Sequence, residues 1–103
     1  MTFPGEPLRM TDTIKRLKPQ LSVIMKADYR LMGELSRELR VLTDKQCFDI
    51  LSERTERRRN DALLDLLTSE ELCDKFMTAL QRTQQQHVVN YIIENGGQKL
   101  GGL

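Results

Sequence analysis

"RVLTDKQCFDILSERTERRRNDALLDLL" is the stretch from Arg40 to Leu67, and its pattern decides the fold class of the chain. Thr43 stands three residues before Gln46. In this capping-box pattern the threonine side chain caps a free backbone amide and the glutamine reaches back to the threonine. Apolar residues then recur at helical spacing instead of alternating. The stretch therefore predicts two consecutive helices, one beginning after Thr43 and one after Thr55.

The helical pattern extends outward from this stretch in both directions, and strand signals are absent. Two helices are predicted before it, at about residues 11–25 and 28–39. Two more follow, opening at "TSEE" (68–71) and "TQQQ" (83–86), which both have the capping-box pattern. Asn95-Gly96 supplies a left-handed stop for the last helix. The body of the chain is therefore predicted to be all-α, with six helical segments.

One side of each predicted helix is apolar and is expected to face a common core. Pro19 interrupts the first segment. Its missing amide donor and the crowding of the preceding turn predict a kink or a break into two short helices. The predicted inward residues are Ile14, Leu17, Leu21, Ile24, Leu31, Met32, Leu35, Leu39, Cys47, Phe48, Ile50, Leu51, Leu63, Leu66, Leu67, Leu72, Phe76, Met77, Leu80, Val88, Val89, Ile92 and Ile93.

Length and composition restrict the class of protein. The chain has 103 residues with a net charge of +1, which fits one domain with no global attraction to nucleic acid or anionic lipid. Cys47 and Cys73 match no metal or redox spacing, and we interpret both as reduced core thiols of a cytosolic protein. No apolar run has the length of a membrane span, and no signal peptide is evident. We therefore expect no membrane insertion and a cytoplasmic location.

The two ends of the chain differ in composition from the helical body. The first nine residues contain two prolines and a glycine before any periodic pattern, and the last eight are glycine-rich. These compositions are typical of segments without regular structure. The predicted organisation is a flexible N-terminal segment at 1–10, a helical bundle at 11–95 and a glycine-rich tail or linker at 96–103.

The sequence lacks the residue groupings that catalysis or metal binding requires. The chain has one histidine, His87, and the sequence shows no acid or nucleophile positioned to work with it. We interpret it as a partly buried or surface residue. Neither cysteine has a recognisable base partner. No glycine-rich phosphate loop and no His/Cys/Asp/Glu grouping at metal spacing is present. We therefore expect no enzyme activity, no small-molecule substrate, no cofactor and no metal site.

Charge is distributed unevenly along the chain. Residues 1–26 carry five basic and two acidic side chains, and residues 54–61 carry four basic and two acidic ones. Residues 27–53 carry four basic and six acidic side chains, and residues 62–103 carry three and five. Any electrostatic function must therefore come from the separation of charge within the molecule, since the net charge is close to zero.

Three interpretations of the arginine run at 54–59 are open. It can be a solvated helix face with local pairs, such as Arg57 with Asp61. It can bind nucleic acid, although the low net charge, the 5% aromatic content and the absence of a readout motif weaken this interpretation. It can dock onto an acidic protein surface, such as that of a second copy. A basic face meeting an acidic face gives head-to-tail association, which leads to rings or helical filaments.

The order of segments resembles a caspase recruitment domain (CARD), a branch of the death-fold superfamily. "RVLTDKQCFDIL" resembles the end of that family's second helix and the start of its third, and "ERTERRRNDALLDLL" resembles its fourth. "CDKFMTALQRTQQQHVVNYI" is similar to its passage from the fifth to the sixth helix, and "IKRLKPQL" to its first, which is typically kinked. The resemblance covers about residues 11–95. "TSEE" departs from the family, which often has Lys-Gly or Arg-Gly in that connection.

This resemblance implies a six-helix antiparallel Greek-key bundle. It also implies that the chain is an interaction module for homotypic CARD–CARD binding in apoptotic or innate-immune signalling, including inflammasome-type helical filaments. The implied partners are other CARD proteins or further copies of this chain. The domain can then be the recruitment part of a larger protein such as a caspase or a kinase. A monomeric decoy that only caps a partner is the alternative within the family.

In the family, a basic surface on the first and fourth helices often meets an acidic surface on the second and third. Carried over to this sequence, the resemblance implies two groups of site residues that agree with the uneven charge. The basic set is Lys15, Lys18, Lys26, Arg54, Arg57 and Arg58. The acidic set is Glu34, Glu38, Asp44, Asp49 and Glu53.

Overall fold

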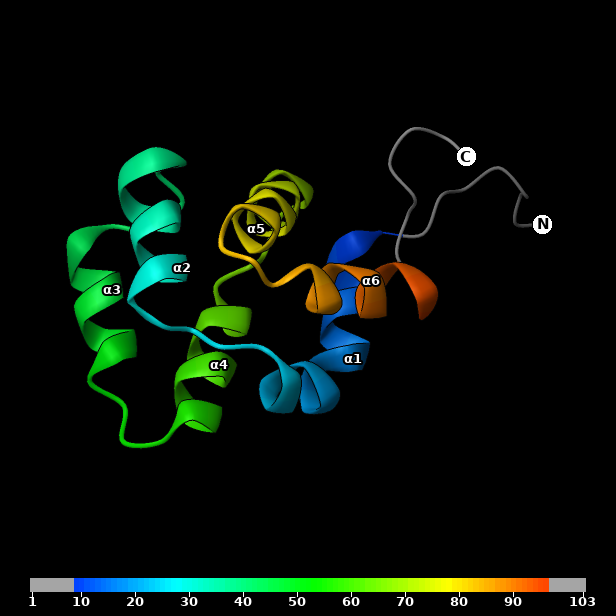
Figure 1. The fold of residues 1–103 in the computed structure, drawn as a ribbon, viewed down its shortest axis with the longest axis horizontal. Coiled ribbons are helices and arrows are strands. Elements are labelled where there is room, and N and C mark those ends of the chain that lie inside the picture. The colour runs from blue at the N-terminus through cyan, green and yellow to red at the C-terminus, as the bar shows by residue number, and fades with distance from the viewer. Residues whose placement is uncertain (1–8, 97–103) are drawn as a thin grey trace.

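The computed structural model describes residues 9–96, which form a bundle of short helices (Figure 1). The elements are α1 (Met10–Ile24), α2 (Tyr29–Gly33), the π-helical turn η1 (Glu34–Glu38), α3 (Asp44–Leu51), α4 (Glu56–Asp65), α5 (Glu70–Arg82) and α6 (Gln86–Glu94). No strand occurs between residues 9 and 96, and the predicted all-α fold with six helices is confirmed. Most of the predicted N-terminal segment and glycine-rich tail lies outside the described residues.

The helices are arranged along the long axis of the molecule. Figure 1 shows α2 and α3 side by side at one end, α1 and α6 at the other, and α4 and α5 between them. α1 packs against α4, α5 and α6, while α3 packs against α4 and η1 against α5. One apolar core therefore connects elements that are far apart in the sequence, and it holds α1 and α3 at separate ends.

Phe48 is the clear exception among the predicted core residues. The other predicted residues are buried or packed half-buried against the core, whereas Phe48 is 71% exposed. α3 is only two turns long, and Ile50, together with the half-buried Cys47 and Leu51, covers its contact with the bundle. Phe48 lies about 200° around the helix from Ile50 and so points away from the core. The prediction that Phe48 is inward was wrong. Leu64 was not predicted and is buried.

Pro19 lies inside α1 without dividing it. α1 is one α-helix from Met10 to Ile24, so the predicted break into two short helices does not occur. Pro19 is exposed, and water can reach the Lys15 carbonyl that loses its usual amide partner. Leu17 and Leu21 are buried on either side of the proline. Core packing therefore keeps the helix continuous through a residue that disfavours it.

The helix starts in the opening stretch are formed as predicted. The Gln46 amide donates to Thr43 Oγ1 at 3.1 Å, and the Thr43 amide donates to Gln46 Oε1 at 2.9 Å, which completes the capping box of α3. Thr55 caps α4 by accepting a hydrogen bond from the Arg58 amide at 3.1 Å. These caps satisfy backbone donors that have no partner inside the helix.

The two later capping boxes were predicted wrongly. Ser69, not Thr68, is the N-cap of α5, and its hydroxyl accepts from the Leu72 amide at 3.1 Å. The Thr83 hydroxyl instead donates back to the Ala79 carbonyl at 2.8 Å, at the C-terminal end of α5. α6 has no side-chain cap. A Ser or Thr hydroxyl can cap the helix that follows it or donate to a carbonyl one turn earlier in the same helix, and the capping-box pattern does not distinguish the two.

Candidate interaction surfaces

A buried amide joins α1 to α4. The Asn60 side chain on α4 is fully buried, and its Nδ2 donates to the carbonyls of Ser22 and Met25 at 2.9 and 2.8 Å. Its Oδ1 accepts from the Ala27 amide at 2.9 Å. The C-terminal end of α1 and the connection that follows it are thereby fixed to the middle of α4.

A second side-chain amide, that of Gln85 directly before α6, holds the same connection. Gln85 Oε1 accepts from the Lys26 amide at 2.8 Å, and Gln85 Nε2 donates to the Lys26 carbonyl at 2.9 Å. His87 is exposed, and its Nε2 lies 3.1 Å from the Ile24 carbonyl oxygen. The backbone of Lys26 is therefore held in place while its side chain is exposed to solvent.

Most of the basic set lies on the surface formed by α1 and α4. Lys15, Lys26, Arg57 and Arg58 are exposed, and none of them takes part in an ion pair within residues 9–96. Arg57 is one turn before Asn60, which contacts the segment next to Lys26. Lys26 and Arg57 are therefore at the same end of the α1–α4 pair.

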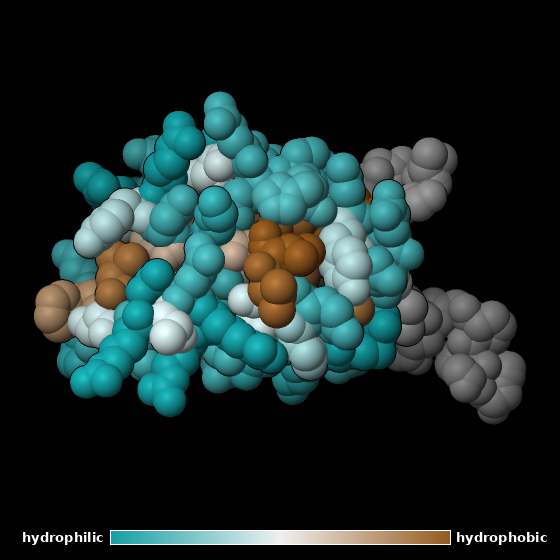
Figure 2. Space-filling view, turned by 60° about the horizontal axis from the view of Figure 1, so that its bottom comes forward, coloured by the Kyte–Doolittle hydropathy of each residue, from teal (hydrophilic) through white to brown (hydrophobic). Residues whose placement is uncertain are grey.

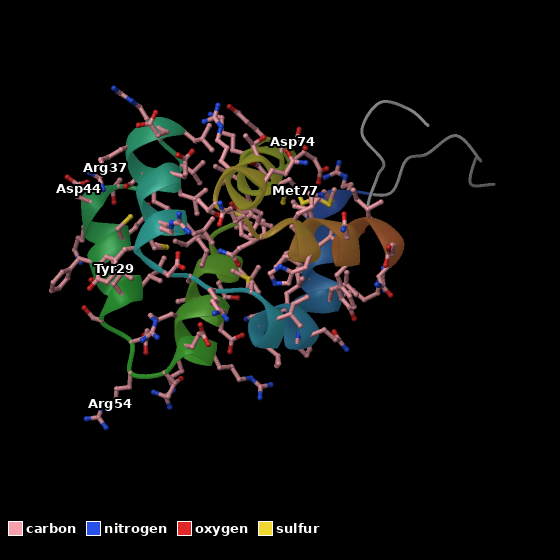
Figure 3. All side chains as sticks on the ribbon, viewed as in Figure 1. Tyr29, Arg37, Asp44, Arg54, Asp74 and Met77 are labelled. Carbon is pink, nitrogen blue, oxygen red and sulfur yellow. The ribbon has the colours of Figure 1, made fainter. Side chains whose placement is uncertain are left out.

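Two members of the basic set differ from the rest. Lys18 is half-buried and forms an ion pair with Asp65 of α4 at 2.5 Å, so its charge is largely offset. Arg54 lies in the connection between α3 and α4, where it points into solvent away from α1 (Figure 3). The neighbouring Arg59 turns back and donates to the Glu53 carbonyl at 3.0 Å. The exposed basic surface thus consists of Lys26, Arg57 and Arg58 at one end of the α1–α4 pair, with Lys15 farther along α1.

The acidic set lies toward the opposite end, around η1 and α3. Glu38, Asp44 and Asp49 are exposed, and Glu53 is half-buried just after α3. Glu34 is half-buried and pairs with Arg82 of α5 at 3.3 Å, while Asp49 pairs with Lys45 at 3.1 Å. These two carboxylates already have cationic neighbours. Glu38 and Asp44 are the exposed members of the acidic set that have no ion pair in the described part of the chain.

The comparison with known families bears on what these surfaces do. The model of the caspase recruitment domain family matches residues 12–93 of the chain. The chain belongs to the caspase recruitment domain family. No curated protein and no solved structure is significantly similar to it. CARDs are interaction modules that bind other CARDs, and the six helices of this CARD are those of the death fold.

The surface of this CARD also has a shallow groove between α2 and α3. It has a volume of about 390 Å³ and is lined by residues of α2, η1 and α3, including Tyr29, Arg37, Asp44 and Leu51. Figure 3 shows Arg37 and Asp44 next to each other at its edge. Arg37 therefore brings a positive charge close to the acidic set, so this surface is mixed in charge.

At the other side of the CARD, Glu70 caps α1 from the first turn of α5. Its two carboxylate oxygens accept hydrogen bonds from the amides of Met10 and Thr11, both at 2.9 Å. The hydrogen bond from the Thr11 backbone, with further contributions from Met10 and Arg9, lowers the pKa of Glu70 below its ordinary value despite partial desolvation. This carboxylate joins the starts of two helices that are 60 residues apart.

The two thiols of this CARD differ in environment. Cys73 is fully buried, and burial, with smaller contributions from Glu70 and Asp74, raises its pKa to about 12. Cys47 is half-buried beside the α2–α3 groove. Both were predicted to be core thiols, which holds fully for Cys73, whereas Cys47 lies at the edge of the core.

Asn60, Gln85 and Glu70, which position these surfaces, were not predicted from the sequence. Asn60 could have been found, because it falls on the stripe that also contains Leu63, Leu64 and Leu67. Gln85 and Glu70 carry no such signal, because each acts on a backbone that is distant in the sequence. Among the described residues, no helix is both long enough and apolar enough to cross a membrane, and no cluster of three potential metal ligands occurs.

Proposed function

We propose that this CARD binds other CARDs, or further copies of itself, in a head-to-tail manner. The basic set of one molecule docks on the acidic set of the next, in the cytoplasm, as part of apoptotic or innate-immune signalling. A contact of this type uses two different surfaces of the same molecule, so it does not close in a dimer and continues into a ring or a helical filament. Inflammasome-type assembly follows from such growth.

The observation that carries this proposal is the presence of exposed charges that form no ion pair within the described residues, on two separate parts of the bundle. Lys26, Arg57 and Arg58 are exposed and have no ion pair between residues 9 and 96. Glu38 and Asp44, around η1 and α3, are in the same situation. Exposed charges that form no ion pair within the molecule are available to a partner. They steer the encounter of the two molecules and fix the register of docking.

Charge reversal on α4 tests the proposal. The double variant R57E/R58E should keep its helical circular dichroism spectrum, because both side chains are exposed. Its assembly, measured by light scattering and pelleting, should be abolished, since the reversed surface repels the acidic set. The control is D74R/E94R, which reverses two exposed carboxylates of α5 and α6 outside both sets and should assemble as the unmodified chain does. Unchanged assembly of R57E/R58E would reject this surface.

Salt and concentration series separate the proposal from its alternatives. Assembly through exposed charges should weaken as salt is raised from about 0.05 to 0.5 M, because screening shortens the reach of the charges. A monomeric decoy would scatter as a monomer at every concentration while still binding a partner CARD. A nucleic-acid-binding domain would retard DNA or RNA in a gel at physiological salt, and R57E/R58E would remove that retardation without an effect on self-assembly.

A further inference from the structure

Three large apolar side chains are strongly exposed in the described part of the chain. They are Val23 at 66%, Tyr29 at 79% and Phe48 at 71%. Figure 2 shows apolar side chains reaching the surface in two main places on one face, near its middle and at its left end, with hydrophilic residues around them. Large apolar side chains within a polar rim are typical of the centre of a protein interface.

Phe48 belongs to the acidic end of the molecule. It lies on the outer side of α3, with Asp44 one turn before it and Asp49 next to it in the chain. Its ring covers no part of the core, although its burial would remove more apolar surface from water than that of any other exposed residue of α3.

Val23 belongs to the basic end. It lies on the outer side of α1 in the last turn, three residues before Lys26. The clamps made by Asn60 and Gln85 hold the backbone directly after it. Val23 is therefore an exposed apolar side chain on a rigid support, which lowers the entropy lost when it docks.

We propose that Phe48 of one copy of this chain packs against Val23 of the next copy, at the centre of the head-to-tail contact. This inference rests on the proposed function and names the residues at the middle of that contact. Val23 is the strongly exposed large apolar side chain of the basic surface, and Phe48 is the one on the outer side of α3, whereas Tyr29 lies in the α2–α3 groove. When the basic and acidic surfaces of two copies face each other, Phe48 and Val23 are brought together beside the complementary charges of the two sets. The partner is a second copy, because both halves of the pair are on this one chain.

A charge swap tests the pairing directly. V23E places a carboxylate on the basic surface so that it faces the acidic surface of the next copy, and F48K places an ammonium group on the acidic surface in the same way. Each single variant should raise the critical concentration for assembly by about tenfold or more, the effect of losing a central interface residue. The double variant V23E/F48K should recover assembly, because the introduced carboxylate and ammonium then meet across the contact. An equimolar mixture of the single variants should also assemble.

The outcomes separate this pairing from the broader proposal. If R57E/R58E blocks assembly and V23E/F48K assembles worse than either single variant, the pairing of Phe48 with Val23 is refuted. The docking of the basic set on the acidic set is then still supported. Single variants that assemble normally refute the pairing too, as does an unmodified chain that remains monomeric at every concentration. Circular dichroism should show an unchanged fold for all variants, because both side chains are exposed and contribute little to the core.

Discussion

Replacing Asn60 with alanine should destabilise this CARD more than any other single loss of a polar side chain between residues 9 and 96. Asn60 is fully buried and makes three hydrogen bonds, two to carbonyls of α1 and its end and one to the amide of Ala27. Alanine removes all three and leaves the backbone groups of Ser22, Met25 and Ala27 without that partner. A buried polar group that loses its partner keeps its desolvation cost, which makes the loss larger than the net gain from forming the bond.

The expected size of the effect follows from these three contacts. Each intramolecular hydrogen bond contributes about 1 kcal/mol in net terms, and buried groups left unpaired cost at least that much, so N60A should lower the free energy of unfolding by at least about 3 kcal/mol. Domains of this size have total stabilities of about 5–15 kcal/mol. At about 4–8 °C per kcal/mol, the melting temperature should fall by about 12–24 °C.

Urea denaturation followed by circular dichroism at 222 nm measures this loss. The matched control is N90A, since Asn90 is exposed on α6 and accepts only one hydrogen bond, from Gln86 one turn away. That variant should lose less than about 0.5 kcal/mol. N60A could instead lose less than about 1 kcal/mol of unfolding free energy, with an unchanged dependence of that free energy on urea concentration. This result would show that other partners replace the three hydrogen bonds, and it would refute the reasoning.

Three further predictions concern a cap, a carboxylate and the thiols. S69A should lower the free energy of unfolding by about 1 kcal/mol and T68A by much less, because Ser69 makes the cap of α5, and thermal melts of both variants decide between them. The pKa of Glu70 is lowered in the folded state, so its stabilising contribution is present above its ordinary value of 4.5 and is lost as pH falls through the folded value. The stability difference between the unmodified chain and E70Q, from urea titrations at pH 7 and pH 3, should therefore shrink at the lower pH, and a constant difference would contradict the capping role. Iodoacetamide at pH 8 should alkylate Cys47 first, because burial raises the pKa of Cys73 to about 12 and keeps that thiol protonated; intact-mass and peptide mapping would show this order, and faster labelling of Cys73 would contradict it.

The charged surfaces could be predicted only in part from the sequence. Helical periodicity places Arg57 and Arg58 away from the core, and the structure confirms that both are exposed. Which charges are offset by neighbours could not be predicted in this way. The Glu34–Arg82 pair joins residues 48 positions apart, and nothing local to Glu34 indicates it. Ion pairs between elements depend on which helices lie side by side, which is a property of the packed bundle.

The sequence alone determined the helical class, the number of helices and the start of α3, because these depend on contacts within one or two turns. The capping box of Thr43 and Gln46 closes within four residues. Only the tertiary structure decided that Phe48 faces solvent and that Asn60 and Gln85 hold the end of α1. The physical reason is that a side chain's burial and partners depend on the element packed against it, and in this fold that element is usually far away along the chain.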